Sequence, residues 1–176
     1  MVDKHIVKDF DNDLDHIKDR INKISGLVES QLSYSYQSLI ERDNVLAERV
    51  VARDKEIDQL HEELLDLAVK MFALRQPFAN DLRYVISSLK IASDLERIGD
   101  QSKNIGKASR WLSKMPQNQT VLSIDNLFNA VDSNFRKVIN AYNDEDSAKA
   151  KKLWLKEAET NKYYDILFRE TLTYML

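Results

Sequence analysis

The chain has 176 residues, enough for one domain or two small ones. Its composition, 43% hydrophobic and 31% charged with three glycines and two prolines, favours long helices over a turn-rich β-sandwich or α/β fold. The lack of cysteine excludes disulfides and thiolate metal sites and fits a reducing compartment. A net charge of -3 without a dense Lys/Arg block argues against a nucleic-acid partner. No apolar run approaches the roughly 20 residues of a membrane span, and the first residues do not resemble a signal peptide.

The first predicted helix covers residues 6–41. Its apolar residues alternate spacings of four and three, which is typical of helices in antiparallel bundles and coiled coils. The pattern changes phase near Gly26. The predicted seam consists of Phe10, Leu14, Ile17, Ile21, Ile24, Val28, Leu32, Tyr36 and Leu39.

Two further helices are predicted over 44–75 and 78–114. Pro77 separates them, because the residue before a proline is pushed out of the α region. The predicted stripe of the first is Ile57, Leu60, Leu64, Leu67, Met71 and Leu74, and that of the second is Ile91, Leu95, Ile98, Ile105 and Leu112.

A polar linker at 116–119 precedes a fourth predicted helix over 123–142. Its inward residues are predicted to be Leu127, Val131, Phe135, Val138 and Tyr142. Asp144 or Asp146 can cap a fifth helix, which we expect to run to the end of the chain.

An internal repeat relates these last two helices to the first two. An offset of 103 residues aligns apolar positions such as Val28 with Val131 and Leu64 with Leu167. It also aligns Asp43 with Asp146, so the loops between the helices match. We therefore predict an all-α fold of two similar three-helix bundles: residues 1–116 form the first, and residues 117–176 form two helices of a second that lacks its third helix here.

This truncated second bundle is predicted to leave an apolar surface open. Burying one large apolar side chain is worth roughly 1.5–3 kcal/mol, so the open surface calls for chain beyond Leu176, contact with the first bundle, or a dimer partner. We favour chain beyond Leu176, and we expect it to carry a motif like the Glu96-Arg97-Ile98-Gly99-Asp100 segment of the third predicted helix. The residues concerned are Leu127, Val131, Phe135, Leu153, Leu167 and Phe168.

Two pairs of acidic residues stand four apart on the second and third predicted helices: Asp54 with Asp58, and Glu96 with Asp100. Like charges at this spacing destabilise a helix by roughly 0.2–0.5 kcal/mol per pair, so the pattern suggests a cation between them. A helical wheel places both pairs outside the bundle core. All-oxygen ligands suit Mg²⁺, Ca²⁺, Mn²⁺ or iron. The alternative is an ordinary solvated acidic surface.

Catalytic patterns are missing from the sequence. There is no Glu-x-x-His pair of the ferritin type, no phosphate-binding glycine loop and no zinc spacing. His61, three residues after Asp58, is either a peripheral ligand or a solvated surface histidine. We predict that the protein is not an enzyme.

Four segments around the acidic pairs form a recognisable set: Gln76-Pro77, Ala79-Asn80-Asp81-Leu82-Arg83, Asp94-Leu95-Glu96-Arg97-Ile98-Gly99-Asp100 with Asn104-Ile105, and Asp54-Lys55-Glu56-Ile57-Asp58. With these segments the sequence resembles the PhoU family of bacterial phosphate-uptake regulators. The resemblance implies tandem three-helix bundles and surface clusters of iron, zinc or another divalent cation. Carried over, the metal ligands are Asp54, Asp58, Glu96 and Asp100.

The resemblance also implies a function. Family members act in the cytoplasm, often as homodimers, and damp the phosphate-starvation response by linking the ATPase of the phosphate ABC transporter to a sensor histidine kinase. Two alternatives stay open: a related accessory protein of a low-affinity phosphate permease, and a metal-dependent carboxylate enzyme. In the second repeat Asn161 stands where Asp58 stands in the first, so a second metal site is in question.

Overall fold

The computed structural model describes residues 3–75, 77–115, 123–155 and 157–175, with the side chains of 12–74, 77–115, 123–155, 158 and 160–173. Every regular element in these ranges is an α-helix. The helices are α1 (Asp3–Glu41), α2 (Asn44–Arg75), α3 (Ala79–Leu112), α4 (Ser123–Asn143), α5 (Ser147–Trp154) and α6 (Glu157–Met175). They form two compact units, Met1–Leu112 and Ser113–Leu176.

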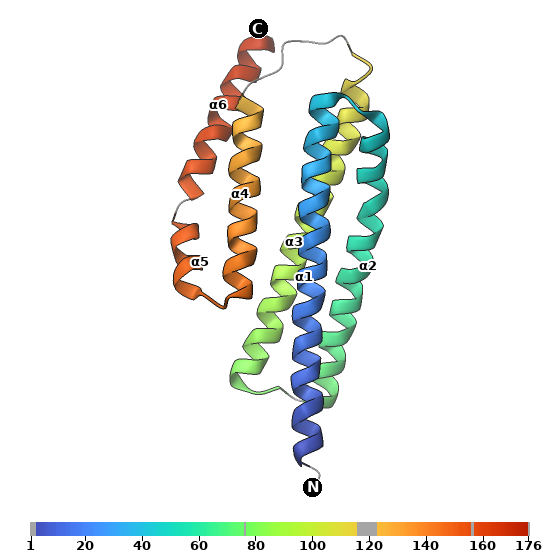
Figure 1. The fold of residues 1–176 in the computed structure, drawn as a ribbon, viewed down its shortest axis with the longest axis vertical. Helices are drawn as coiled ribbons and strands as arrows, with labels where there is room; N and C mark the ends of the chain where they lie inside the picture. The colour runs from blue at the N-terminus through green and yellow to red at the C-terminus, as the bar shows by residue number, and fades with distance from the viewer. Residues whose placement is uncertain (1–2, 76, 116–122, 156, 176) are drawn as a thin grey trace. The chain divides into compact units, whose positions relative to one another are not determined.

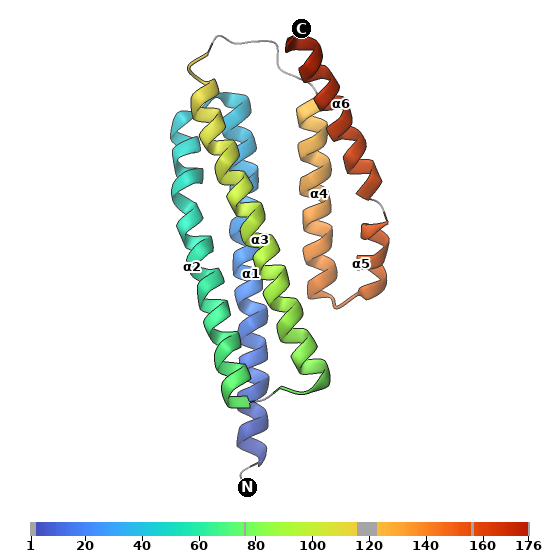
Figure 2. The same cartoon turned by 180° about the vertical axis from the view of Figure 1, so that it is seen from behind.

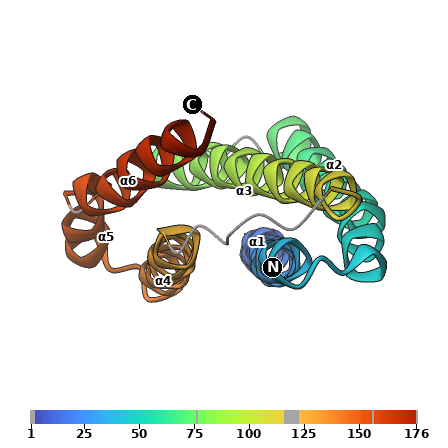
Figure 3. The same cartoon turned by 90° about the horizontal axis from the view of Figure 1, so that it is seen from above.

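The first unit is an up-down-up bundle of α1, α2 and α3. Each of the three helices packs against both others, so every helix contributes one face to a shared core. Figure 1 shows the three helices running side by side, and Figure 3 views α1 nearly end-on with α2 and α3 beside it.

The buried positions follow alternating spacings of three and four on all three helices. On α1 the seam begins with Ile17, Ile21, Ile24 and Val28 and continues in the same register. The predicted phase shift near Gly26 is wrong, because the seam becomes polar there and does not change phase. Its later members are Gln31, Ser35 and Ser38, all fully buried.

The seam of α3 is built largely from small residues. Val85, Ser88, Ala92, Leu95, Gly99, Ser102, Gly106 and Ser109 are buried at strict three–four spacing. Added Cβ atoms at Gly99 and Gly106 would lie 3.1 Å from α2 side chains, so α3 lies very close to α2. The predicted α3 stripe therefore contains only one of these buried positions, Leu95, because hydropathy does not reveal small residues packed by close approach.

Three residues predicted to face inward are exposed. They are Leu74 on α2, Leu112 on α3 and Val138 on α4. Leu74 and Leu112 stand near helix ends, where the partner helices no longer cover them.

The two inter-helix loops have the same conformation at the 103-residue offset. Arg42 and Glu145, which are 103 residues apart, both adopt left-handed backbone, with φ of 56° and 53°. The Asp43 amide then donates to the Ser38 carbonyl at 3.1 Å, and the Asp146 amide donates to the Ala141 carbonyl at 3.0 Å. This is the Schellman pattern of helix termination.

The same aspartates also cap the helices that follow. Asp43 Oδ1 accepts from the Val45 and Leu46 amides at 2.8 and 3.0 Å, and Asp146 Oδ1 accepts from the Lys149 amide at 2.8 Å. Asp146 was one of two predicted caps, and it is the one that caps α5. Each turn thus ends one helix and begins the next, with two residues between α1 and α2 and three between α4 and α5.

The second unit contains α4 packed against α5 and α6. Figure 2 shows α5 and α6 following one another along α4. The prediction of a single fifth helix to the chain end is wrong, because the helix ends at Trp154 and a new one begins at Glu157. Nothing in the local sequence, which has neither proline nor glycine, explains this break.

Candidate metal centre on the α2–α3 face

The four predicted acidic residues lie together on one face, shared by α2 and α3. Burial raises the pKa of Asp58, and the charges of Asp54 and Asp100 raise it further, so these carboxylates lie close together. Glu96 is affected in the same way by Asp100, Asp58 and Asp54. The antiparallel packing of α2 and α3 brings the two i, i+4 pairs into register.

Asp54 is not on the outside of the bundle as predicted. It is only 4% exposed, because it occupies a seam position of α2 between Val50 and Ile57. A carboxylate at such a depth needs a charged or hydrogen-bonding partner. The other three acidic residues are half-buried.

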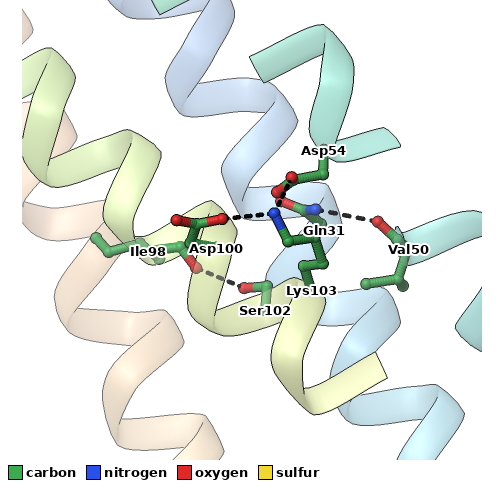
Figure 4. A network of polar contacts seen from close by, with 7 residues as sticks. All are labelled: Gln31, Val50, Asp54, Ile98, Asp100, Ser102 and Lys103. Atoms are coloured by element: carbon green, nitrogen blue, oxygen red, sulfur yellow. Dashed lines mark hydrogen bonds and ion pairs between the residues drawn. The ribbon is translucent and has the colours of Figure 1, made fainter. Parts of the chain in front are cut away.

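The partner is Lys103 of α3, which sequence reasoning missed. Its ammonium donates to Asp54 Oδ2 and, at 2.6 Å, to Asp100 Oδ1. Figure 4 shows the lysine amine lying between these two carboxylates, which come from different helices. A detectable signal was the lysine three residues after Asp100, since acid–lysine pairs at this spacing attract one another.

A second missed residue is Gln31 on the buried seam of α1. Its Nε2 donates to the Val50 carbonyl at 3.1 Å, one helical turn before Asp54. Its Oε1 accepts from no group in the part of the chain that the structure describes. Figure 4 draws the Gln31 amide alongside Asp54 and Lys103.

The charges on this face shift the pKa of its members in a consistent way. Partial burial, followed by the neighbouring carboxylates, raises the pKa of Asp58, and Lys103 opposes that rise. Burial, followed by Asp100, likewise raises the pKa of Glu96, while His61 opposes the rise. Hydrogen bonds to Asp100 and Asp54 raise the pKa of Lys103, so the lysine stays positively charged.

His61 lies at the edge of this face. Its Nε2 is 3.3 Å from the Ser93 hydroxyl of α3, and its charge acts on Glu96. The sequence allowed two interpretations of His61, a peripheral metal ligand or a solvated surface side chain. Its position beside Glu96 is compatible with either.

The donor chemistry of the face fits a hard cation. Four carboxylates and an unpartnered buried amide oxygen offer the ligands that Mg²⁺, Mn²⁺ or iron accept. As the side chains stand, however, no three acidic or imidazole groups among the described residues are arranged around one ion. The Asp54 and Asp100 oxygens instead converge on the Lys103 ammonium.

The corresponding place in the second repeat has weaker ligands. Asn161, at the position equivalent to Asp58, is an exposed neutral side chain on α6. The Glu157 and Glu159 side chains lie outside the described residues. Whether a second site exists stays a prediction.

Comparison with known proteins places the chain in a family. The family model named PhoU domain matches residues 21–109, which include all of the acidic face. A phosphate-specific transport system accessory protein PhoU homolog of Caulobacter vibrioides is 36% identical over 98% of this chain and 76% of the relative. This chain belongs to the PhoU family.

Other relatives agree with that assignment. The PhoU homolog of Zymomonas mobilis is 37% identical over 98% of this chain and 73% of the relative. The crystal structure of PhoU from Pseudomonas aeruginosa has a TM-score of 0.90 and 28% identity, covering 94% of this chain and 80% of that one. The predicted family and all-α fold are thereby confirmed.

Membership in this family also bears on catalysis and on membrane topology. Because the family consists of regulatory and accessory proteins, the chain is not an enzyme, and the alternative of a carboxylate enzyme is set aside. Across the described residues, none of the helices combines the length and hydrophobicity needed to cross a bilayer.

Proposed function

We propose that this PhoU-family protein is an accessory and negative regulator of phosphate uptake, which damps the phosphate-starvation response when phosphate is plentiful. The observation that carries the proposal is the 36% identity to an accessory protein of the phosphate-specific transport system over nearly the whole chain. A long helical bundle with no catalytic pattern supports the role of an adaptor.

The proposed partners are the ATPase subunit of the phosphate ABC transporter and a sensor histidine kinase. The protein is proposed to act in the cytoplasm as a homodimer, peripheral to the membrane through these partners. An adaptor needs extended surfaces, and the exposed faces of α1–α3, each more than 30 residues long, supply them.

We further propose that Asp54, Asp58, Glu96 and Asp100 bind a divalent cation such as iron or zinc. When bound, the metal would cross-link α2 and α3 by neutralising carboxylates that otherwise repel one another. The raised pKa of Asp58 and of Glu96 supports this, because burial and the neighbouring carboxylates disfavour their charged forms, and a bound cation would favour those forms.

Deletion of the gene tests the regulatory role. In a strain without a paralogue, the deletion should switch on a phosphate-starvation promoter in high phosphate, or alter phosphate uptake, and the intact gene on a plasmid should restore both. Unchanged promoter activity and unchanged uptake in the deletion strain would contradict the proposal.

A pull-down separates this proposal from its alternative. Tagged protein should retain the transporter ATPase or the histidine kinase from a lysate of its own host. Retention of a low-affinity phosphate permease, with neither of those partners, would favour an accessory protein of that permease.

A further inference from the structure

A lysine occupies the centre of the acidic face. The Lys103 ammonium holds one oxygen of Asp54 from α2 and one of Asp100 from α3 (Figure 4). These are two of the four carboxylates that we propose as metal ligands. One positive group therefore already links the two helices that a metal ion would link.

The ammonium and a metal ion would compete for the same oxygens. The carboxylate lone pairs that accept hydrogen bonds from the ammonium are not free to ligate a hard cation at 2.0–2.6 Å while those hydrogen bonds last. Two cations at this spacing would also repel one another. A metal ion that binds Asp54 Oδ2 and Asp100 Oδ1 therefore competes with the Lys103 ammonium for these oxygens.

The Lys103 side chain is partly exposed and flexible, so its ammonium can move away from the two carboxylates. The Asp54 side chain is 6% exposed, whereas that of Lys103 is 22% exposed and reaches inward on a flexible four-carbon stem. Rotation about that stem carries the ammonium into solvent without moving either helix. Asp54 lies on a seam position and stays in place.

Gln31 provides a second and independent indication that a cation can be bound here. Its amide is fully buried and fixed at Nε2 by the Val50 carbonyl, which leaves Oε1 without a donor among the described residues. A buried carbonyl oxygen without a partner is costly unless it has another use. A neutral oxygen beside carboxylates is a common ligand of hard cations.

We propose that Lys103 is the resident counter-ion of the acidic face, joining α2 to α3 in the metal-free protein, and that a hard divalent cation binds by displacing it from Asp54 and Asp100. This inference rests on the metal site proposed above. We call Lys103 a competitive gate, because its competition with the metal ion sets the metal concentration at which the ion replaces the ammonium. A metal-bound protein would differ from a metal-free one by a released lysine on the surface of α3.

Metal titration of two lysine variants tests the competition. Full-length wild-type protein, Lys103→Met and Lys107→Met are stripped with chelator and titrated with Mn²⁺ by calorimetry. Lys107 is the matched control, because it lies one turn further along α3 and is exposed. Lys103→Met should bind Mn²⁺ more tightly than wild type by roughly 5–150-fold, the usual range of coupling between two ligands. Lys107→Met should change the affinity by much less.

Labelling of the wild-type chain tests displacement without any substitution. An amine-reactive reagent is applied with and without Mn²⁺, and modification of each lysine is read by mass spectrometry. Lys103 should react slowly without metal and faster with it, while Lys107 should not change. This measurement decides the matter even if Lys103→Met folds poorly.

The outcomes separate the two proposals. If Mn²⁺ binds to wild type but Lys103→Met binds it no more tightly and Lys103 labelling is unaffected, the metal site stands and the gate is refuted. If no variant takes up Mn²⁺, nor Fe²⁺ or Zn²⁺ in parallel titrations, the metal site itself is refuted and the gate with it.

Discussion

The two units of this chain contain the same turn after their first helix and differ in how far their helices are covered by others. Both contain a Schellman turn whose last residue, Asp43 or Asp146, caps the next helix, with matching hydrogen bonds. In the first unit α3 packs on both other helices and the seam is buried throughout. In the second, only Ser123 and Ala141 of α4 are buried and no residue of α5 is.

The turn is therefore determined by the local sequence, whereas the burial of a helix depends on how completely other helices cover it. In the second unit, Trp154 is 72% and Phe168 53% exposed, and Tyr164 stacks on Phe168 with centroids 6.2 Å apart. Of the six residues predicted to present an open surface, Phe168 is exposed, and Leu127, Val131, Phe135, Leu153 and Leu167 are half-buried. The prediction of a third helix for this unit falls outside the described residues.

Truncating matched leucines should give the largest contrast between the units. Leu64 is fully buried, and its repeat equivalent Leu167 is half-buried. Leu64→Ala should lower the free energy of unfolding of the first unit by about 2–5 kcal/mol, because it leaves a cavity. Leu167→Ala should cost the second unit less than half as much. Urea denaturation followed by circular dichroism measures both, and equal losses would contradict the contrast.

Glycine substitutions should sharpen the description of the first unit. At Gly106 an added methyl group would meet Val50 Cγ1 at 3.1 Å and the Ala47 backbone carbonyl at 3.3 Å, so the Val50 side chain and the α2 backbone must shift by a few tenths of an ångström. We expect Gly106→Ala to lower stability by about 1–2 kcal/mol, after allowing for the better helix propensity of alanine.

Gly26 supplies the control on the exposed side of α1, where an added Cβ has nothing within 4 Å. Gly26→Ala should raise stability by up to about 1 kcal/mol through propensity alone. Thermal unfolding of both variants checks the signs. A stabilised Gly106→Ala would mean that the α2–α3 contact is looser than described.

Removing either cap should weaken the helix that follows it by a similar amount, but should change the stability of the two units unequally. Asp43→Ala and Asp146→Ala each remove a side-chain acceptor worth about 1 kcal/mol to the helix that follows. Because α2 is integral to the closed bundle, Asp43→Ala should lower the unfolding midpoint of the first unit. Asp146→Ala should only speed hydrogen exchange in α5, and a shift of the first unit's midpoint by Asp146→Ala would argue against independent units.

The smallest effect concerns pH and the acidic face in the metal-free protein. The raised pKa of Asp58 means that its contribution to stability is present below about pH 3.8 and is lost as the pH rises through the folded-state value. Asp58→Asn avoids that loss. The variant should be more stable than wild type by about 0.2–0.5 kcal/mol at pH 7, and the gain should shrink as the pH falls toward 3.8.

Denaturation in urea from pH 4 to 7 measures this difference. Asp66→Asn, at an exposed position on the same helix, is the control. If both variants show the same pH profile, the repulsion among Asp58 and its neighbours is not its cause.

Much of this protein could be read from its sequence. The helices, the separation at Pro77 and the 103-residue repeat follow from periodicity, from backbone restrictions and from local capping, each of which acts over a few residues. The grouping of Asp54, Asp58, Glu96 and Asp100 followed from equal spacing on consecutive helices. These features depend on short-range geometry, which sequence spacing encodes directly.

Other features were decided only by the tertiary structure. The α3 seam is buried because small residues let two backbones approach, and hydropathy cannot tell a serine or glycine in such a contact from one in solvent. Asp54 is buried because Lys103, 49 residues later in the chain, meets it there. Gln31 joins the same region from a third helix. Such pairings depend on how far apart the helices pack and in which register, and these are properties of the assembled bundle that no single helix carries in its own sequence.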